Sequence, residues 1–207
     1  MSRALLLCCA ALLAAGCTRM VDGEAVPAFP GTISASAVDV DRVLLDHSRM
    51  QAITGGGERL TIIPSMDGKS PVDIDTLAET TPPACRFVYA ETVTFGPDID
   101  EFHKTTFQYP PRGGLISEGV AAYRDAGTAR RTFDALVATV RDCATTSAGY
   151  AFVGDWSADR RSLHTRPGGC GRDYRVKSMV LIEVTYCGFP ESVSDIVITN
   201  IAANVPG

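Results

Sequence analysis

The chain has 207 residues, a formal net charge of −5 at pH 7 and 45% hydrophobic residues. This acidic balance gives no global attraction to nucleic acid or to anionic lipid, so we expect no nucleic-acid partner. Beyond the first 16 residues the chain is long enough for one domain with its own core.

Residues 1–16 are typical of a secretory signal peptide. Arg3 supplies the positive start, and residues 4–15 form an apolar stretch that is short for a membrane span. The run LAAGC at 13–17 matches a lipobox, which predicts cleavage before Cys17 and lipidation of that cysteine. An ordinary cleaved signal followed by an incidental cysteine is the alternative.

The rest of the chain divides into a tether and a folded domain. Residues 17–37 begin with the lipidated cysteine and continue in Pro, Gly, Ser and Ala without periodicity, which is typical of a flexible linker. Residues 38–207 are predicted to form one domain. Together these segments predict a protein held by lipid on the outer, extracytoplasmic face of the cell membrane.

Four cysteines remain in the predicted domain: Cys85, Cys143, Cys170 and Cys187. An even number of cysteines outside the cytoplasm favours two disulfides, and four cysteines allow three pairings. A metal site is the alternative, but no cysteine pair has CxxC spacing and the three histidines are scattered, at positions 47, 103 and 164. We therefore expect no metal and no cofactor.

The first half of the domain indicates one helix and a hairpin. Asp46 is a candidate N-cap for a helix over 47–54, which the three glycines at 55–57 would end. Residues 64–84 are rich in Pro, Asp, Ser and Thr and are predicted to be a loop. Alternating segments then predict strands at 102–109 and 115–123, joined by the turn sequence PPRGG.

The second half contains the clearest helix. Apolar side chains recur at helical spacing over 126–143, and Asp125 is a candidate cap. Residues 150–166 favour two strands around a turn at 157–159, and residues 174–187 are rich in β-forming residues. A last helix is predicted from Ser192, whose spacing to Asp195 suggests a capping box, to about residue 204.

The order of these elements, with the four cysteines, resembles the PknH-like extracellular sensor domain over about residues 38–206. The motifs that carry the resemblance include Leu44-Leu45-Asp46, Pro82-Pro83-Ala84-Cys85, Arg141-x-Cys143 and Cys187-Gly188-Phe189. Domains of this family form the extracellular part of certain actinobacterial Ser/Thr kinases and also occur as free-standing lipoproteins. The resemblance implies an α+β fold with a twisted antiparallel sheet packed by helices and a possible ligand cleft. The sequence contains no kinase domain, so kinase signalling is not carried over.

With the resemblance in view, we predict the disulfides Cys85–Cys143 and Cys170–Cys187. If Cys170 lies directly opposite Cys187, strand pairing leaves Ser178-Met179 as a two-residue hairpin loop. Counting from that loop places the cysteines at a non-hydrogen-bonded pair, where the Cα atoms approach to about 4.5 Å. The weak point is the loop itself, because type I′ turns favour Asn or Gly.

Two features are candidates for ligand binding. Trp156 has the aromatic surface to stack on a sugar, although packing in the core is the commoner role of a tryptophan. A run of cations stands out in this acidic chain and would suit an anionic envelope component if the strands are adjacent. The alternative is that edge strands carry such charges to prevent sheet association. These cations are Arg160, Arg161, Arg166, Arg172, Arg175 and Lys177.

Two classes of function remain. The first is a non-catalytic sensor or binding module for an unknown lipid, glycan or protein of the envelope. The second is a small envelope hydrolase or transferase whose site is built from dispersed residues. No local signature places a nucleophile beside a base, and no Gly-x-Ser-x-Gly motif occurs. The sequence therefore favours a binding module without enzymatic activity.

Overall fold

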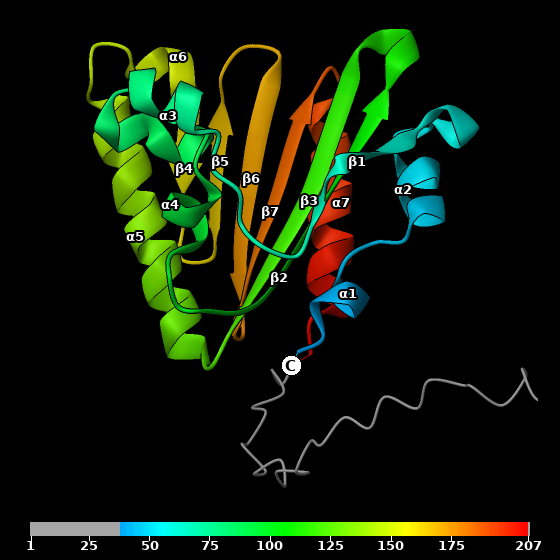
Figure 1. Ribbon diagram of the computed structural model, residues 1–207, viewed down its shortest axis with the longest axis horizontal. Coiled ribbons are helices and arrows are strands. Elements are labelled where there is room, and N and C mark those ends of the chain that lie inside the picture. Colours follow the sequence, from blue (N-terminus) through cyan, green and yellow to red (C-terminus); the bar gives the residue numbers. More distant parts are fainter. Residues whose placement is uncertain (1–37, 207) are drawn as a thin grey trace, which may run out of the picture. The chain divides into compact units, whose positions relative to one another are not determined.

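The computed structural model describes residues 38–206, which form a seven-stranded antiparallel sheet with helices on both faces (Figure 1). The strand order is β1-β2-β3-β7-β6-β5-β4. The strands are β1 (Thr61–Gly68), β2 (Ile99–Tyr109), β3 (Gly114–Tyr123), β4 (Asp155–Ala158), β5 (Ser162–Arg166), β6 (Cys170–Lys177) and β7 (Val180–Cys187).

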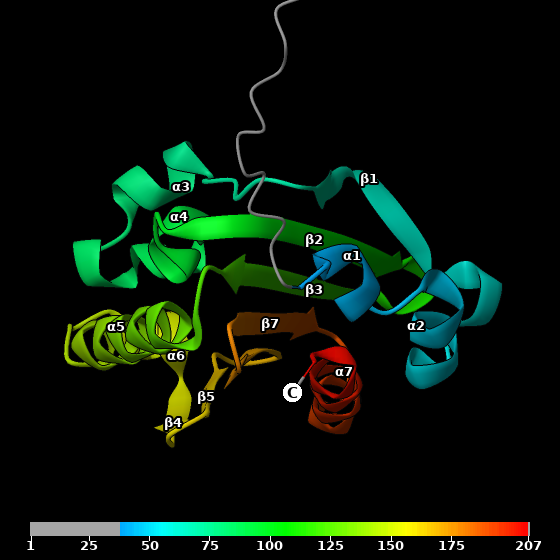
Figure 2. The ribbon, with the colours of Figure 1, turned by 90° about the horizontal axis from the view of Figure 1, so that it is seen from below.

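The helices divide between the two faces of the sheet, as Figure 2 shows. One face is covered by α1 (Val40–Val43), α2 (His47–Thr54) and α7 (Glu191–Asn204). The other carries α3 (Asp75–Thr80), α4 (Glu91–Phe95), α5 (Ala126–Ala144), α6 (Gly149–Val153) and the 3-10 helix η2 (Pro83–Val88). Two further 3-10 turns are η1 (Gly57–Arg59) and η3 (Pro110–Arg112).

Each face of the sheet has its own hydrophobic core because successive strand residues point to opposite sides. On β7, Val180, Ile182 and Val184 pack in the α7 core, whereas Leu181 packs in the α5 core. The two faces of the sheet therefore carry separate cores.

Local signals account for the helices that the sequence predicts. Asp46 Oδ1 accepts a hydrogen bond from the amide of Arg49 at 2.8 Å, and Gly55 ends α2 in the left-handed conformation. Asp125 Oδ1 likewise accepts from the amide of Thr128 at 2.7 Å at the start of α5. Each cap satisfies an amide that lacks a partner inside its helix.

The hairpin register is confirmed. Cys170 pairs with Cys187, and the pairing continues to Lys177 with Val180, so Ser178 and Met179 form a two-residue loop. The Cα atoms of the bonded cysteines lie 4.1 Å apart. Of the described residues other than glycine, only Ser178 has a positive φ, 53°. The loop is therefore not type I′, which needs positive φ at both central positions.

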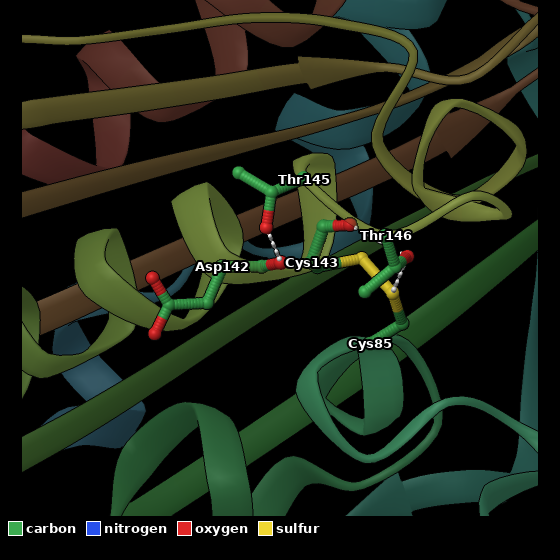
Figure 3. The surroundings of a disulfide bond; sticks show 5 residues. All are labelled: Cys85, Asp142, Cys143, Thr145 and Thr146. Carbon is green, nitrogen blue, oxygen red and sulfur yellow. Dashed lines mark hydrogen bonds between the residues drawn. A yellow bond between two sulfur atoms is a disulfide. The ribbon is translucent and has the colours of Figure 1, made fainter.

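The second disulfide, Cys85–Cys143, is also as predicted and joins η2 to the last turn of α5 (Figure 3). Both cysteines are fully buried. The hydroxyl of Thr146 donates to the carbonyl of Cys143 at 2.8 Å and lies 3.8 Å from Cys85 Sγ. The link holds η2 against the end of α5.

The prediction of a loop over 64–84 is wrong in part. The segment includes most of β1, all of α3 and the start of η2. β1 forms because it pairs with β2, with an irregular register between Ile62 and Asp67. The expected cap of the last helix is wrong too, because α7 begins at Glu191 after Pro190 rather than at Ser192. Both errors involve contacts that a local pattern does not contain.

Candidate functional site

The six cations predicted as one patch are divided by the sheet. On β6, strand alternation places Arg172 on the face covered by α5, and Arg175 and Lys177 on the face covered by α7. Arg166, on β5, also lies on the α7 face. Arg160 and Arg161 lie in the turn between β4 and β5. Three of the six prove to be committed to internal contacts.

Arg166 belongs to a polar cluster that attaches α7 to the sheet. Its NH2 lies 2.7 Å from Asp173 Oδ1, and its Nε donates to Glu191 Oε1 at 2.7 Å. Asp173 is fully buried and also accepts hydrogen bonds from His164 Nδ1, at 2.6 Å, and from the Ser194 hydroxyl. Burial alone would raise the pKa of Asp173, but these three donors outweigh it and hold that pKa below its usual value.

This cluster has the residue types of a catalytic triad but not its arrangement. Ser194 and His164 both donate to Asp173, so the serine is not hydrogen-bonded to the imidazole that would activate it. Ser194 is also fully buried. The hydrogen bond to Asp173 raises the pKa of His164, which favours its charged form as a partner of the buried carboxylate. The cluster is suited to holding α7 in place.

Lys177 is committed to the end of the same helix. Its ammonium donates to the carbonyls of Ala202 and Val205 at 2.8 and 2.9 Å. Carbonyls at a helix C-terminus lack partners within the helix and carry its negative dipole end, so a cation there is stabilising. Lys177 therefore has a structural role.

Arg172 lies in a largely buried charge cluster on the opposite face. Its NH2 donates to the carbonyl of Val88 at 2.8 Å, and its Nε lies 3.9 Å from Glu183 Oε1. Lys104 lies 2.8 Å from Glu91 and 3.5 Å from Glu183. Burial would raise the pKa of Glu183, but the charges of Lys104 and Arg172 hold it below its usual value.

The three remaining arginines share a surface hollow of about 530 Å³, which we call the arginine hollow. It is lined by Asp159, Arg160, Arg161, Ser162 and Arg175. The carboxylate of Asp159 closes the β4–β5 turn, since its Oδ1 accepts from the amides of Arg161 and Ser162 at 2.6 and 2.7 Å. These amides lower the pKa of Asp159.

Arg160 and Arg161 are exposed, and their guanidinium groups have no ion pair or hydrogen bond to other residues of the described chain. Arg175 makes one long hydrogen bond, 3.4 Å, to the Thr199 hydroxyl. With Asp159 as the sole lining acid, the hollow has an excess of two positive charges. Planar guanidinium groups bind phosphate, sulfate or carboxylate groups through paired hydrogen bonds, so the hollow is suited to an oxyanion.

A second hollow, of about 440 Å³, has the opposite charge. Its lining includes Asp39, Asp41, Asp100 and Glu101, with Lys69 as the cation. Asp41 is paired with Lys69 at 2.6 Å and with His103 at 2.8 Å. No group of three or more acidic, histidine or cysteine side chains suited to a metal ion occurs in the part of the chain that the structure describes.

Trp156 is partly buried and packs against the α5 core. This is the commoner of the two roles expected for it. Neither hollow includes it. The structure therefore gives Trp156 a packing role and no visible place in a binding site.

Sequence reasoning missed the buried charges on the central strands. Glu118 and Glu183 are each at most 4% exposed, and Asp173 is fully buried. In the sequence, each is recognisable only as an acidic residue at a strand position whose side chain faces the interior. Which partner compensates each charge depends on strand pairing and on α7, so it cannot be deduced from neighbouring residues.

These features define a class: a disulfide-bonded α+β domain with an open antiparallel sheet, helices on both faces and no assembled catalytic group among its described clusters. A model of the PknH-like extracellular domain matches residues 35–204, and the chain belongs to this family. Among solved structures, the chain is similar to the extracellular domain of PknH from Mycobacterium tuberculosis, with a TM-score of 0.60 and 17% identity. That likeness covers 80% of this chain and 95% of the other and concerns the fold. No curated protein matches the chain.

The family places the domain outside the cytoplasm. Among residues 38–206, no helix has both the length and the apolar character to cross a bilayer. Cys17 and the predicted signal peptide lie outside the described residues.

Proposed function

We propose that the chain is a lipid-anchored, non-catalytic sensor or binding module on the outer face of the cell membrane, and that its ligand is an anionic component of the envelope. The lipobox ending at Cys17 supports the anchor, and family membership supports the extracytoplasmic sensor role. One observation carries the choice of ligand. The guanidinium groups of Arg160 and Arg161 have no acidic partner in the described chain and share a hollow with Arg175.

A capture experiment tests this function. The chain from residue 17, carrying Cys17→Ser, is secreted so that its disulfides form, immobilised and exposed to cell-envelope extract. Mass spectrometry of the retained material should identify an anionic lipid or glycan, and Arg160→Ala with Arg161→Ala should abolish its retention. Retention that is unchanged in this double variant would refute the assignment of the site.

The same experiment separates binding from catalysis. A binding module returns its ligand chemically unchanged, whereas a small hydrolase or transferase releases a modified product. The arrangement of Ser194 and His164 around Asp173 favours the first outcome, since the serine has no base. Turnover of the retained compound would establish the enzymatic alternative.

A further inference from the structure

We propose that the arginine hollow binds the phosphoryl headgroups of the membrane to which the chain is anchored. This deepens the proposed function and rests on its lipid anchor. It commits to one occupant, an anionic phospholipid surface.

The strand pairing places the hollow and the start of the described domain at the same end of the sheet. At that end Lys177 on β6 pairs with Val180 on β7, which pairs with Ala122 on β3. Ala122 in turn pairs with Glu101 on β2. The amide of Val40, close to the first described residue, donates to Glu101 Oε2 at 3.3 Å. The start of the domain therefore lies at the same end of the sheet as the end of β6, with three strand spacings between β2 and β6.

The hollow adjoins this end of the sheet. Arg175 is two residues from the end of β6, and it pairs with Ser162, the first residue of β5. Between β2 and β5 there are four strand spacings, which is about 19 Å at about 4.8 Å each. The segment after α7 lies at this end as well, because Lys177 at the end of β6 donates to the carbonyl of Val205.

The predicted tether is long enough to allow contact. Residues 18–37 number 20 (37 − 17) between Cys17 and the domain. A flexible chain of this length has a mean end-to-end distance of about 25 Å and an upper limit of roughly 70 Å. A lipid on Cys17 would therefore keep the tether end of the domain, with its hollow, within reach of the bilayer surface.

The guanidinium groups of Arg160 and Arg161 make no ion pair or hydrogen bond within the described chain, whereas other exposed cations at this end do. Arg131, for example, donates to the Thr128 hydroxyl. Arg42, Lys69 and Arg124 each form an ion pair with an aspartate, respectively Asp39, Asp41 and Asp125. The acidic hollow lies on the β2 side, so an anionic surface is repelled there and attracted at the β4–β5 turn. This asymmetry would orient the domain with the turn toward the headgroups.

Vesicle partitioning tests the proposal with the Cys17→Ser chain, which has no lipid of its own. The probe is phosphatidylcholine vesicles with about 30% phosphatidylglycerol, in about 0.1 M salt, where surface charges are only partly screened. The parent chain should sediment with these vesicles and not with pure phosphatidylcholine. Because each arginine near an anionic surface raises partitioning roughly fivefold, Arg160→Ala with Arg161→Ala should lower it about 25-fold.

Arg112→Ala with Arg141→Ala is the matched control. It removes the same charge from η3 and from the last turn of α5, both at the opposite end of the strands. We expect this control to partition like the parent. An equal loss of partitioning in both double variants would show a response to net charge alone and would overturn the proposal. The proposal would also be overturned if the parent chain bound vesicles with and without phosphatidylglycerol equally.

Two further outcomes are informative. If titration calorimetry shows tight, arginine-dependent binding of inorganic phosphate or glycerol phosphate without vesicle binding, the hollow is a small-anion site and the membrane proposal fails. Fatty-acid labelling of the full chain at Cys17 tests the anchor separately. Labelling without vesicle binding would leave the proposed function standing and reject the headgroup site.

Discussion

Asp173 on β6 and Ser194 on α7 share a hydrogen bond in the fully buried seam between the sheet and the last helix. Asp173 also pairs with Arg166, whose guanidinium reaches Glu191 in the first turn of α7. A single buried carboxylate thus connects β5, β6 and α7. The stability of this face of the domain therefore depends on the negative charge of Asp173.

Asp173→Asn should therefore destabilise the domain by roughly 3 kcal/mol, because it keeps the side-chain volume but leaves Arg166 without its buried counter-charge. Urea unfolding measures the change. Asp195→Asn, at an exposed position one residue after Ser194, is the control and should shift stability by no more than about 0.5 kcal/mol. Similar losses in both variants would contradict the role given to Asp173.

A second buried acid predicts a pH dependence. Glu118 on β3 is fully buried; its Oε2 accepts from the amide of Leu45 at 3.1 Å, and its Oε1 has no partner among the described residues. Burial raises its pKa from 4.5 to about 8. The folded domain therefore holds this proton between those pH values, whereas the unfolded chain releases it.

The free energy of unfolding of the parent, relative to Glu118→Gln, should be greatest below pH 4.5, where the group is protonated in both states. It should fall by roughly 1.4 kcal/mol per pH unit as pH rises toward 8, and then level off. Because the other titrating groups are shared, the difference between the two curves isolates Glu118. A difference that is constant with pH would show that this carboxyl titrates normally.

Much of the fold can be predicted from the sequence where the signals are local. The β6–β7 register follows from one cross-link and a two-residue loop, and α5 follows from its cap and apolar stripe. β1 is not predictable in this way because its irregular pairing is determined by β2.

The candidate site was predicted only in part. Six cations within residues 160–177 indicate a basic region, but three of them pair with groups on η2, β7 or α7 that are remote in sequence. The three that line the hollow become distinguishable only once those contacts are known. The sequence shows the charge excess, and tertiary structure decides which charges remain available.

The two disulfides should differ in their contribution to stability. Cys85–Cys143 spans 58 residues and Cys170–Cys187 spans 17. The chain-entropy model gives about 4 and about 3 kcal/mol respectively, because a longer closed loop restricts the unfolded chain more. Urea unfolding of the two paired Cys→Ala variants measures both. A larger loss from removing Cys170–Cys187 would mean that native contacts, rather than loop length, set the order.

The prediction that Cys17 is lipidated rests on the sequence alone. Cys17→Ala should leave the precursor unprocessed by the lipoprotein signal peptidase and without a fatty acid. Metabolic labelling with a radioactive or clickable fatty acid measures this, with Cys9→Ala within the signal as the control that keeps its label. Persistent labelling of Cys17→Ala would reject the lipobox.

The hairpin loop offers a stabilising change. Ser178 holds a φ of 53°, a region in which a side chain costs about 1 kcal/mol or more and glycine costs nothing of that kind. Ser178→Gly should therefore raise the free energy of unfolding by roughly 0.5–1 kcal/mol, since glycine's greater freedom in the unfolded chain offsets part of the gain. Ser178→Asn, which tolerates this conformation, should be neutral or slightly stabilising, and Ser178→Ala, which keeps the steric cost of a side chain, should be no more stable than the parent. Thermal and urea unfolding of the three variants would give this order if the loop holds Ser178 in the left-handed region. Equal stability of the alanine and glycine variants would show that position 178 adopts an ordinary negative φ in solution.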